Sequence, residues 1–316
     1  FELAEKQTVT FAVTATGSQA PVISWLAVVQ DEAKEEPDPD AKPVRPVEAL
    51  QAFAGWDQPL EDNGRMEPAS GTTVSKVSGF DTVIDTASEW NNQNQHHASV
   101  VDAASLFQKK EFTVLFDVRQ TPTTATGDLD KRVAMTIGNG KNSLHLLTWS
   151  GKFGYGPDNG GVSSSHVNLV GVTQGGWNAV AMTYRETEAG TAAVCLYVNG
   201  VKAAQIDDVG FLLSGMDDVS AMIARSFNTS FMQPGRYDNI VVLSGTPDEA
   251  TLLAETEWRK WQKEHPPVNT LTLEETVKKA EALAAFGFET EGFAEALAAA
   301  RDLLARAAEL TAAAQP

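Results

Sequence analysis

One short segment joins a tryptophan to a dense series of hydrogen-bonding side chains. Positions 90–97 read Trp-Asn-Asn-Gln-Asn-Gln-His-His. The face of a pyranose ring presents C–H groups that pack on a flat aromatic ring, while its hydroxyl groups reach nearby amides. The segment therefore predicts a sugar-binding site made by Trp90, Asn91, Asn92, Gln93 and His97. The alternative is a long polar loop with Trp90 tucked beneath it.

Two other places could contribute to binding. Trp149 and Tyr155 flank a predicted hairpin turn and would offer a second aromatic platform, unless their rings pack across the strands. Arg225, with Asn228 nearby, would bind the carboxylate of an acidic sugar through two hydrogen bonds. A surface arginine without such a role is the alternative for Arg225.

Acidic side chains in predicted loops offer the hard oxygen atoms that Ca²⁺ prefers. Asp128 and Asp130 lie two residues apart, but without the spacing of a calcium-binding loop, so a polar loop is the competing interpretation. His96 and His97 would point to opposite faces of a strand, which argues against a shared metal ion. Calcium is thus the one cofactor that the sequence leaves open.

Catalytic motifs are missing from the predicted strands. A Glu-x-Asp-x-x-Glu strand would place the carboxyl groups of a glycosidase on one face. Glu36-Pro37-Asp38 has only the first half of this pattern, in a proline-rich context. No phosphate-binding glycine loop, zinc-ligand spacing or serine nucleophile elbow occurs either. The sequence predicts a non-catalytic region, and an enzyme stays open only if distant carboxylates converge in one groove.

Charge and composition limit the classes of binding partner that are expected. The 316 residues include 42 acidic and 24 basic ones, a formal charge of −18 at pH 7. This charge repels polyanions, so nucleic acid is not an expected partner. No signal peptide or membrane-spanning segment is apparent, and a chain that starts at Phe1 looks like a piece of a longer protein. The single cysteine, Cys195, lies in an apolar run and is expected to be a buried hydrophobe.

Most of the chain has the pattern of an antiparallel β protein. Residues 47–246 contain short apolar runs separated by Gly, Asn, Asp and Ser clusters, which predicts a sandwich or jelly roll. Asn199-Gly200 predicts a type I′ hairpin turn, because both residues accept positive φ angles. Strands are expected at Phe112–Val118, Val133–Ile137, Leu144–Trp149, Ala179–Tyr184, Ala193–Val198 and Ile240–Leu243.

The regions on either side of the sandwich differ from it. Residues 1–30 alternate as a strand pair, which belongs either to an Ig-like domain or to the sandwich. Residues 31–46 are acidic and proline-rich, as in a linker. Residues 247–316 have helical patterns, with Thr246 as the expected cap of the first helix. Trp258 and Trp261 would dock that helix on the sandwich.

Three stretches occur in the order expected of one family. Gly176–Tyr184, Leu196–Gly200 and Gly235–Val242 resemble the tryptophan-led strand, the Tyr-Val-Asn-Gly hairpin and the closing Gly-x-x-Asp-Asn strand of laminin-G-like, concanavalin A-like jelly rolls. The resemblance covers residues 50–262. It implies a mainly β protein, an antiparallel jelly-roll sandwich with a C-terminal α-helical region, and it places Trp177 in the core.

The last part of the chain resembles a second family. Leu273–Phe286 and Gly292–Ala313 are amphipathic and predict a helical hairpin. They resemble the FIVAR modules of Gram-positive surface proteins and glycosidases, with an aromatic-containing turn between an Ala-Glu-x-Leu helix and an Ala-Leu-rich helix. This resemblance implies a modular protein that is secreted or attached to the cell surface, with a glycoside hydrolase activity in another of its domains.

The expected function is lectin-like binding of glycan by a non-catalytic accessory module. Host mucin-type or sialylated glycans are the target class that fold-level analogy suggests, and the other domains of the parent protein are the remaining partners. A structural spacer and a protein-binding adhesion module are the alternatives. An exposed Trp90 beside amides would favour glycan binding, whereas a large exposed apolar patch would favour a protein partner.

Overall fold

The computed structural model describes residues 42–76, 82–86, 96–122, 129–158, 163–227, 232–266, 271–285 and 293–314. The chain divides into two compact units, Phe1–Ala41 and Lys42–Pro316, and all described residues belong to the second. The predicted strand pair at 1–30 and most of the predicted linker at 31–46 lie outside the described residues.

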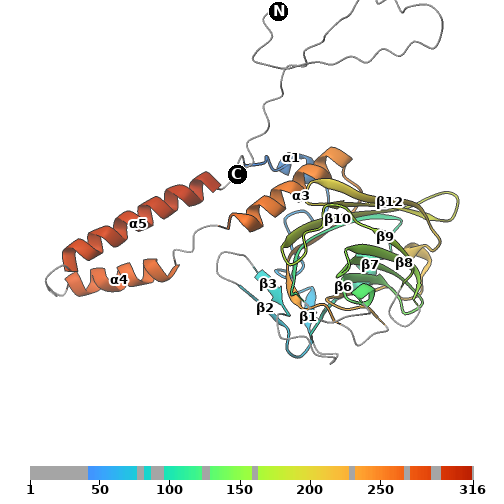
Figure 1. Ribbon diagram of the computed structural model, residues 1–316, viewed down its shortest axis with the longest axis horizontal. Helices are drawn as coiled ribbons and strands as arrows, with labels where there is room; N and C mark the ends of the chain where they lie inside the picture. The colour runs from blue at the N-terminus through green and yellow to red at the C-terminus, as the bar shows by residue number, and fades with distance from the viewer. Residues whose placement is uncertain are drawn as a thin grey trace, which may run out of the picture. The chain divides into compact units, whose positions relative to one another are not determined.

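Two antiparallel sheets of seven strands each form a sandwich (Figure 1). Sheet A has the order β1 (Met66–Pro68), β4 (Ala98–Val100), β13 (Ser220–Ile223), β6 (Val133–Gly138), β7 (Asn142–Thr148), β8 (Lys152–Asp158) and β9 (Ser163–Asn168). Sheet B has the order β12 (Val201–Val209), β11 (Ala192–Val198), β10 (Trp177–Glu186), β5 (Glu111–Gln120), β14 (Gly235–Leu243), β3 (Thr82–Asp85) and β2 (Thr73–Lys76). The predicted fold class, mainly β with helices at the C-terminal end, is confirmed.

Strand β5 illustrates why the two sheets pack together. Phe112, Val114 and Phe116 are fully buried in the main core, between the sheets. Because successive side chains of a strand point to opposite faces, Leu115 and Asp117 face the outer side of sheet B instead. Burial of each large apolar side chain contributes about 1.5–3 kcal/mol, so this alternation holds β5 in register. The short helix α2 (Ala103–Phe107) adds its last residue to the same core.

The strands and turns that the sequence predicts are present. The six predicted runs correspond to β5, β6, β7, β10, β11 and β14. Asn199 and Gly200 join β11 to β12 with φ angles of 53° and 81°, the positive values that a type I′ turn requires. Trp177 is buried, as the resemblance implied.

Helix α3 (Glu249–Glu264) begins two residues later than predicted. Its N-cap is Asp248, whose carboxylate accepts a hydrogen bond from the backbone N–H of Thr251 at 2.9 Å. Thr246, the expected cap, instead donates its hydroxyl to the Glu111 carboxylate. The prediction of Thr246 as cap was therefore wrong, because its hydroxyl is bonded to strand β5 and not to the first turn of the helix.

A second, smaller apolar cluster lies between α3 and the outer face of sheet B. Trp258 is buried, as predicted, whereas Trp261 is only partly buried. Cys195 is also only partly buried and packs against this cluster, so it is not in the main core as the sequence suggested. The helix α1 (Val47–Leu50) contributes its last residue. The members are Leu50, Trp56, Leu115, Ala181, Tyr197, Val241, Leu243 and Leu252.

Helices α4 (Leu271–Ala285) and α5 (Phe293–Ala314) contact each other, in agreement with the two amphipathic stretches of the sequence. Val277 on α4 and Leu297 on α5 are buried. Arg301 pairs with Glu281 across the two helices at 2.8 Å. The predicted helical hairpin is therefore present.

Candidate functional site

The two outer faces of the sandwich carry different side chains. Helix α3 contacts β10, β11 and β12 and so covers part of the outer face of sheet B. On sheet A, the inward positions of β6 and β7 are apolar, for example Met135 and Leu144. The alternate positions of these strands point outward and include the polar side chains of Thr136, Ser143 and His145, all three fully buried. The outer face of sheet A is thus the place to look for binding groups.

A row of aligned residues crosses this outer face. Thr136 on β6 pairs with His145 on β7, and His145 pairs in turn with Gly154 on β8. Gly154 pairs with His166 on β9, while Thr136 pairs on its other side with Met222. Directly opposed residues on neighbouring strands lie about 4.5–5.5 Å apart, so the row brings a hydroxyl group and two imidazoles into one line.

His145 lies at the centre of the row and is fully buried. Its Nε2 atom lies 3.0 Å from the Oγ atom of Ser143, two residues back on the same strand. Burial, with His166 as the second cause, lowers the pKa of His145 to about 3. The ring is therefore neutral near pH 7, with one nitrogen that donates and one that accepts a hydrogen bond.

The ring of His166 lies across the backbone of Gly154. A Cβ atom at position 154 would lie 3.0 Å from Nε2 of His166 and 3.1 Å from Cβ of Ser163. A larger residue at this position would require the imidazole to shift by a few tenths of an ångström. Nε2 of His166 and Oγ of Ser163 are buried and make no hydrogen bond, which marks them as groups with unused hydrogen-bonding capacity.

A small charged cluster lies at the turn end of β7 and β8. Asp130 pairs with Lys152 at 2.9 Å and accepts a hydrogen bond from the hydroxyl of Ser150. Burial alone would raise the pKa of Asp130, but these two hydrogen bonds outweigh it and the pKa is lowered. The pKa of His166 is lowered chiefly by burial, which Asp130 opposes. The Asp130 carboxylate is thus already neutralised by a lysine.

Arg225 lies at the other end of the row. Ala224 has a positive φ of 67°, which turns the chain out of β13. The Thr136 hydroxyl donates to the Arg225 carbonyl at 2.9 Å, so Arg225 lies beside the row. Its side chain is partly buried, and burial lowers the pKa of its guanidinium. His97 is the residue before β4. It precedes Ser99 by two residues, so the alternation of a strand places the two side chains on the same face.

The structure thus brings some of the predicted site residues together. His97 and Arg225 border the outer face of sheet A, and the segments 87–95 and 228–231 adjoin them in sequence. Trp90, Asn91, Asn92, Gln93, Asn228 and Asp128 lie outside the described residues.

The other predicted aromatic residues lie elsewhere. Tyr155 stacks on Phe153 with ring centroids 5.8 Å apart, and it packs against the main core. Tyr155 therefore packs within the sandwich, which was the alternative to a binding platform. Trp149 is partly buried in the turn between β7 and β8. The structure does not place these two rings on one platform.

Sequence reasoning missed the central residues of the row. Thr136, His145 and His166 each lie within a strand, and Ser143 and Ser163 accompany them. The available signal was the alternation of polar and apolar residues from Ser143 to Leu146, whereas Ser163–Asn168 is polar at every position but Val167. That alternation shows an outward face, but the strand order of the sheet is needed to align the residues.

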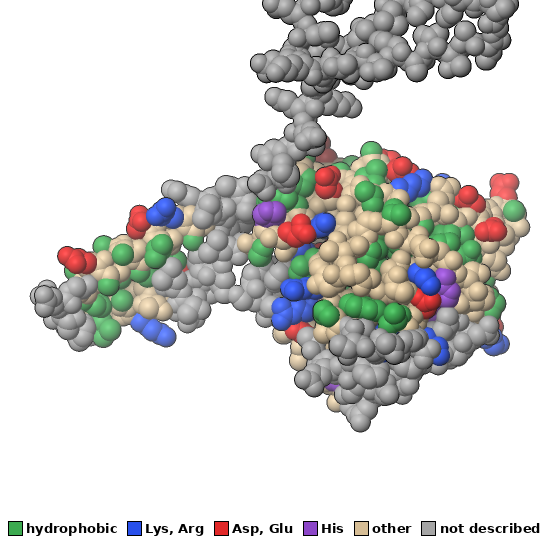
Figure 2. Space-filling model, in the orientation of Figure 1, with side chains coloured by type: hydrophobic (Ala, Val, Ile, Leu, Met, Phe, Trp, Pro, Cys, Tyr) green, Lys and Arg blue, Asp and Glu red, His purple; other side chains and the backbone are tan. Residues whose placement is uncertain are grey.

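Exposed hydrophobic side chains bear on the protein-binding alternative. On the face drawn in Figure 2, hydrophobic side chains occur in small groups between polar and charged ones. Large exposed hydrophobic residues in the described part of the chain are scattered along the sequence: Val44, Val101, Val170, Val201, Leu283 and Leu303. In the same part, no helix is long and apolar enough to cross a membrane, and no three His, Cys, Asp or Glu side chains gather as a metal site.

Comparisons with known proteins add structural likenesses but no family. No protein-family model and no curated protein matches the chain. Domain 4 of AbnA, a GH43 extracellular arabinanase from Geobacillus stearothermophilus solved with arabinotriose, aligns at a TM-score of 0.44 and 14% identity, over 63% of this chain and 95% of that one. The CBM40 of the Ruminococcus gnavus IT-sialidase aligns at 0.36 and 16% identity, over 60% and 97%.

A third likeness involves only part of the other protein. The botulinum neurotoxin type G receptor-binding domain aligns at a TM-score of 0.37 and 10% identity, over 63% of this chain. This chain spans 46% of that domain. At TM-scores below 0.5, none of these likenesses says what the chain binds.

Proposed function

We propose that this chain is a non-catalytic glycan-binding module, and that the outer face of sheet A with its bordering segments is the contact surface. The observation that carries the proposal is the row of Thr136, His145 and His166, with Arg225 at one end. Glycan hydroxyl groups both donate and accept hydrogen bonds, and hydroxyl and neutral imidazole side chains do the same. Thr136 and His145 are fully buried, so a ligand would meet the partly buried His166 and Arg225 at the ends of the row, with the other two residues as their polar support.

Segments 87–95 and 228–231 would complete the surface. Trp90 precedes His97 by seven residues and would supply the aromatic ring on which a pyranose packs. Asn91, Asn92 and Gln93 would supply amides. Arg225 and Asn228 would bind an acidic sugar, because a guanidinium pairs with a carboxylate through two hydrogen bonds. Sialylated or mucin-type host glycans are therefore the target class that we propose.

The module would serve a secreted or surface-attached bacterial enzyme that degrades glycan. Binding near the substrate raises the effective concentration of a linked catalytic domain without any chemistry in the module. The hairpin of α4 and α5, with its FIVAR-like sequence, would connect the module to the remainder of the protein. Asp128 and Asp130 are the candidate Ca²⁺ ligands, although Lys152 competes for Asp130.

A glycan-array screen of the whole chain, with and without Ca²⁺, tests the proposal. We expect selective binding that Trp90→Ala abolishes and that Arg225→Ala weakens about tenfold, the usual cost of losing a charged hydrogen bond. Arg185→Ala is the matched control, because Arg185 is an exposed arginine of sheet B paired with Glu111. No binding to a broad array would contradict the proposal and favour the structural spacer.

A further inference from the structure

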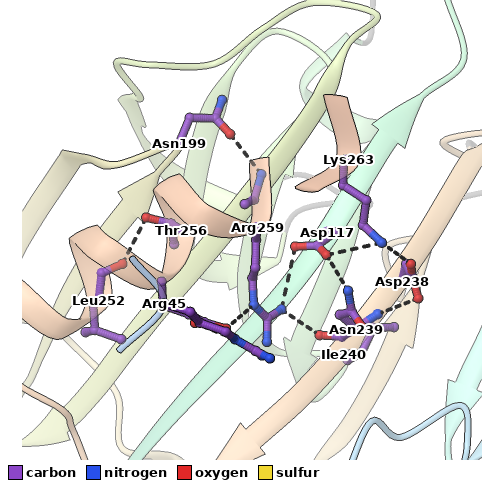
Figure 3. Close-up of polar contacts among 12 residues, drawn as sticks. Arg45, Asp117, Asn199, Asp238, Asn239, Ile240, Leu252, Thr256, Arg259 and Lys263 are labelled. Carbon is purple, nitrogen blue, oxygen red and sulfur yellow. Dashed lines mark hydrogen bonds and ion pairs between the residues drawn. The ribbon is translucent and has the colours of Figure 1, made fainter. Parts of the chain in front are cut away.

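A second polar cluster, separate from the proposed glycan surface, lies under helix α3 (Figure 3). Lys263 on α3 contacts the carboxylates of Asp117 and Asp238, on β5 and β14. Arg259 bonds to Glu255 at 2.8 Å, one turn back on α3, and pairs with Asp117 at 3.5 Å. All five side chains are at most 4% exposed. Charges this deeply buried are stable only when they are paired.

One member of the cluster comes from the far end of the predicted linker. The Nε and Nη2 atoms of Arg45 each donate to the Glu255 carboxylate, both at 3.1 Å. The guanidinium also lies between two indole rings, 4.7 Å from the centroid of Trp56 and 4.1 Å from that of Trp258. A second cation, Lys42, lies 5.7 Å from the ring of Trp261 on α3. Residues 42–46, the strap, are therefore held against the helix.

Counting charges shows what Arg45 adds. Arg259 and Lys263 supply two positive charges, against the three carboxylates of Asp117, Asp238 and Glu255. Glu61, another described acidic group near Asp238, is mostly neutral at pH 7 and about half ionised at pH 8, because burial raises its pKa to about 8. Arg45 is the third positive charge. Among the described residues, the cluster is electrically balanced near pH 7 only with the strap in place, and at pH 8 Glu61 adds to the negative charge.

We propose that the strap, Lys42–Pro46, is a locking element that neutralises the buried charge under α3 and thereby holds this helix on sheet B. Displacement of the strap leaves one buried negative charge without a counter-charge. Uncompensated buried charge is strongly destabilising, so α3 loosens when the strap leaves. The N-terminal end of the described chain is in this way coupled to the helix that precedes α4.

The locking role predicts that the stability lost on removing Arg45 depends on pH. Glu255 faces Arg45 from the strap and Arg259 from its own helix, and Asp117, Asp238, Lys263 and Glu61 complete the charged surroundings. Burial already raises the pKa of Asp238 and of Glu61, and without Arg45 the excess negative charge raises both further in the folded state. A raised folded pKa gives stability that is present at low pH and lost as pH rises. The effect of removing Arg45 must therefore be larger at pH 8 than at pH 5.

Thermal unfolding of the whole chain at pH 5 and pH 8, with hydrogen exchange of the α3 peptides, tests the lock. We expect Arg45→Ala to lower Tm by about 10 °C at pH 8, less at pH 5, and to speed exchange in residues 249–264. Arg45→Ala combined with Glu255→Gln removes one charge of each sign, and most of the lost Tm should return. Arg65→Ala, which breaks an exposed pair with Asp102, is the control and should change little.

Other results would overturn the lock. They are a change in Tm below about 2 °C for Arg45→Ala, an equal loss of Tm at both pH values, or no recovery of Tm in the double variant. An equal loss would mean that Arg45 acts only by packing between the two tryptophans. If Arg45→Ala does not fold, Arg45→Lys takes its place: it keeps the charge but loses the two-pronged hydrogen bond. We then expect a smaller loss of the same size at both pH values, and a loss that grows with pH would contradict the charge argument.

Discussion

The imidazole of His145 is held neutral inside the outer layer of sheet A. Its pKa is lowered to about 3 by burial and by His166, against about 6.5 in an unfolded chain. Between these two values the unfolded chain binds more protons than the folded one. The stability that the neutral ring contributes is therefore complete above about pH 6.5 and is lost as pH falls towards 3, by on the order of 5 kcal/mol in total.

Replacing His145 by glutamine should remove this pH dependence. Glutamine does not titrate and can still bond to Ser143, so His145→Gln should lose less free energy of unfolding than the wild type between pH 6.5 and 4. Urea unfolding at pH 7, 6, 5 and 4 measures the difference. His265→Gln, at the exposed end of α3, is the control. Parallel curves for wild type and His145→Gln would show that His145 is not protonated on unfolding.

Residue types predicted only the edge of the candidate surface. Arg225 and His97 drew attention because of their chemistry and neighbours, and the structure places both beside the row. His145 lies in an ordinary alternating strand and His166 in a polar one, and a polar residue in such a strand usually just faces solvent. Their alignment depends on the strand order β6, β7, β8, β9, which follows from pairings between distant segments and not from local pattern.

Elements were predicted better than their ends. Hydrophobic alternation located six strands and the Asn199-Gly200 turn, because these depend on local sequence. The start of α3 was misplaced because Thr246 and Asp248 are both good caps. Only a tertiary contact decides between them: the Thr246 hydroxyl is bonded to Glu111 of strand β5. Very short strands such as β1 and β13 were not among the predicted ones, because three or four residues carry little periodic signal.

The cap of α3 gives a prediction at this scale. The Asp248 carboxylate accepts hydrogen bonds from the backbone N–H of Thr251 and from its hydroxyl, at 2.9 and 2.8 Å. Asp248→Ala should cost about 1 kcal/mol of stability, seen as a Tm lower by about 2–4 °C. Asp248→Asn keeps an oxygen acceptor and should cost much less. Equal losses for the two variants would mean that the side-chain cap is not what stabilises the start of the helix.

At the scale of the whole molecule, the sandwich separates two kinds of polar chemistry. The outer side of sheet A carries hydroxyl and imidazole groups, of which Thr136 and His145 are fully buried and His166 is partly exposed. The outer face of sheet B carries paired charges that are buried under α3. The composition gives only the net charge of −18. It could not show that Asp117, Asp238 and Glu255 are paired with basic side chains inside the protein. The β-sandwich itself could be predicted, because its sequence pattern is spread over the full domain.

This separation predicts that the two faces act independently. Arg45 lies over sheet B and Arg225 over sheet A, and packed sheets are about 10 Å apart. Changes that far apart with no shared partners usually add to within about 0.5 kcal/mol. Arg45→Ala should therefore lower Tm and yet leave the glycan Kd, measured well below Tm, within about twofold of wild type. Arg225→Ala should weaken binding and leave Tm within about 2 °C, and the double variant should show both effects at full size. A glycan Kd that changes with Arg45→Ala would mean that strain under α3 passes through the core to the proposed binding face.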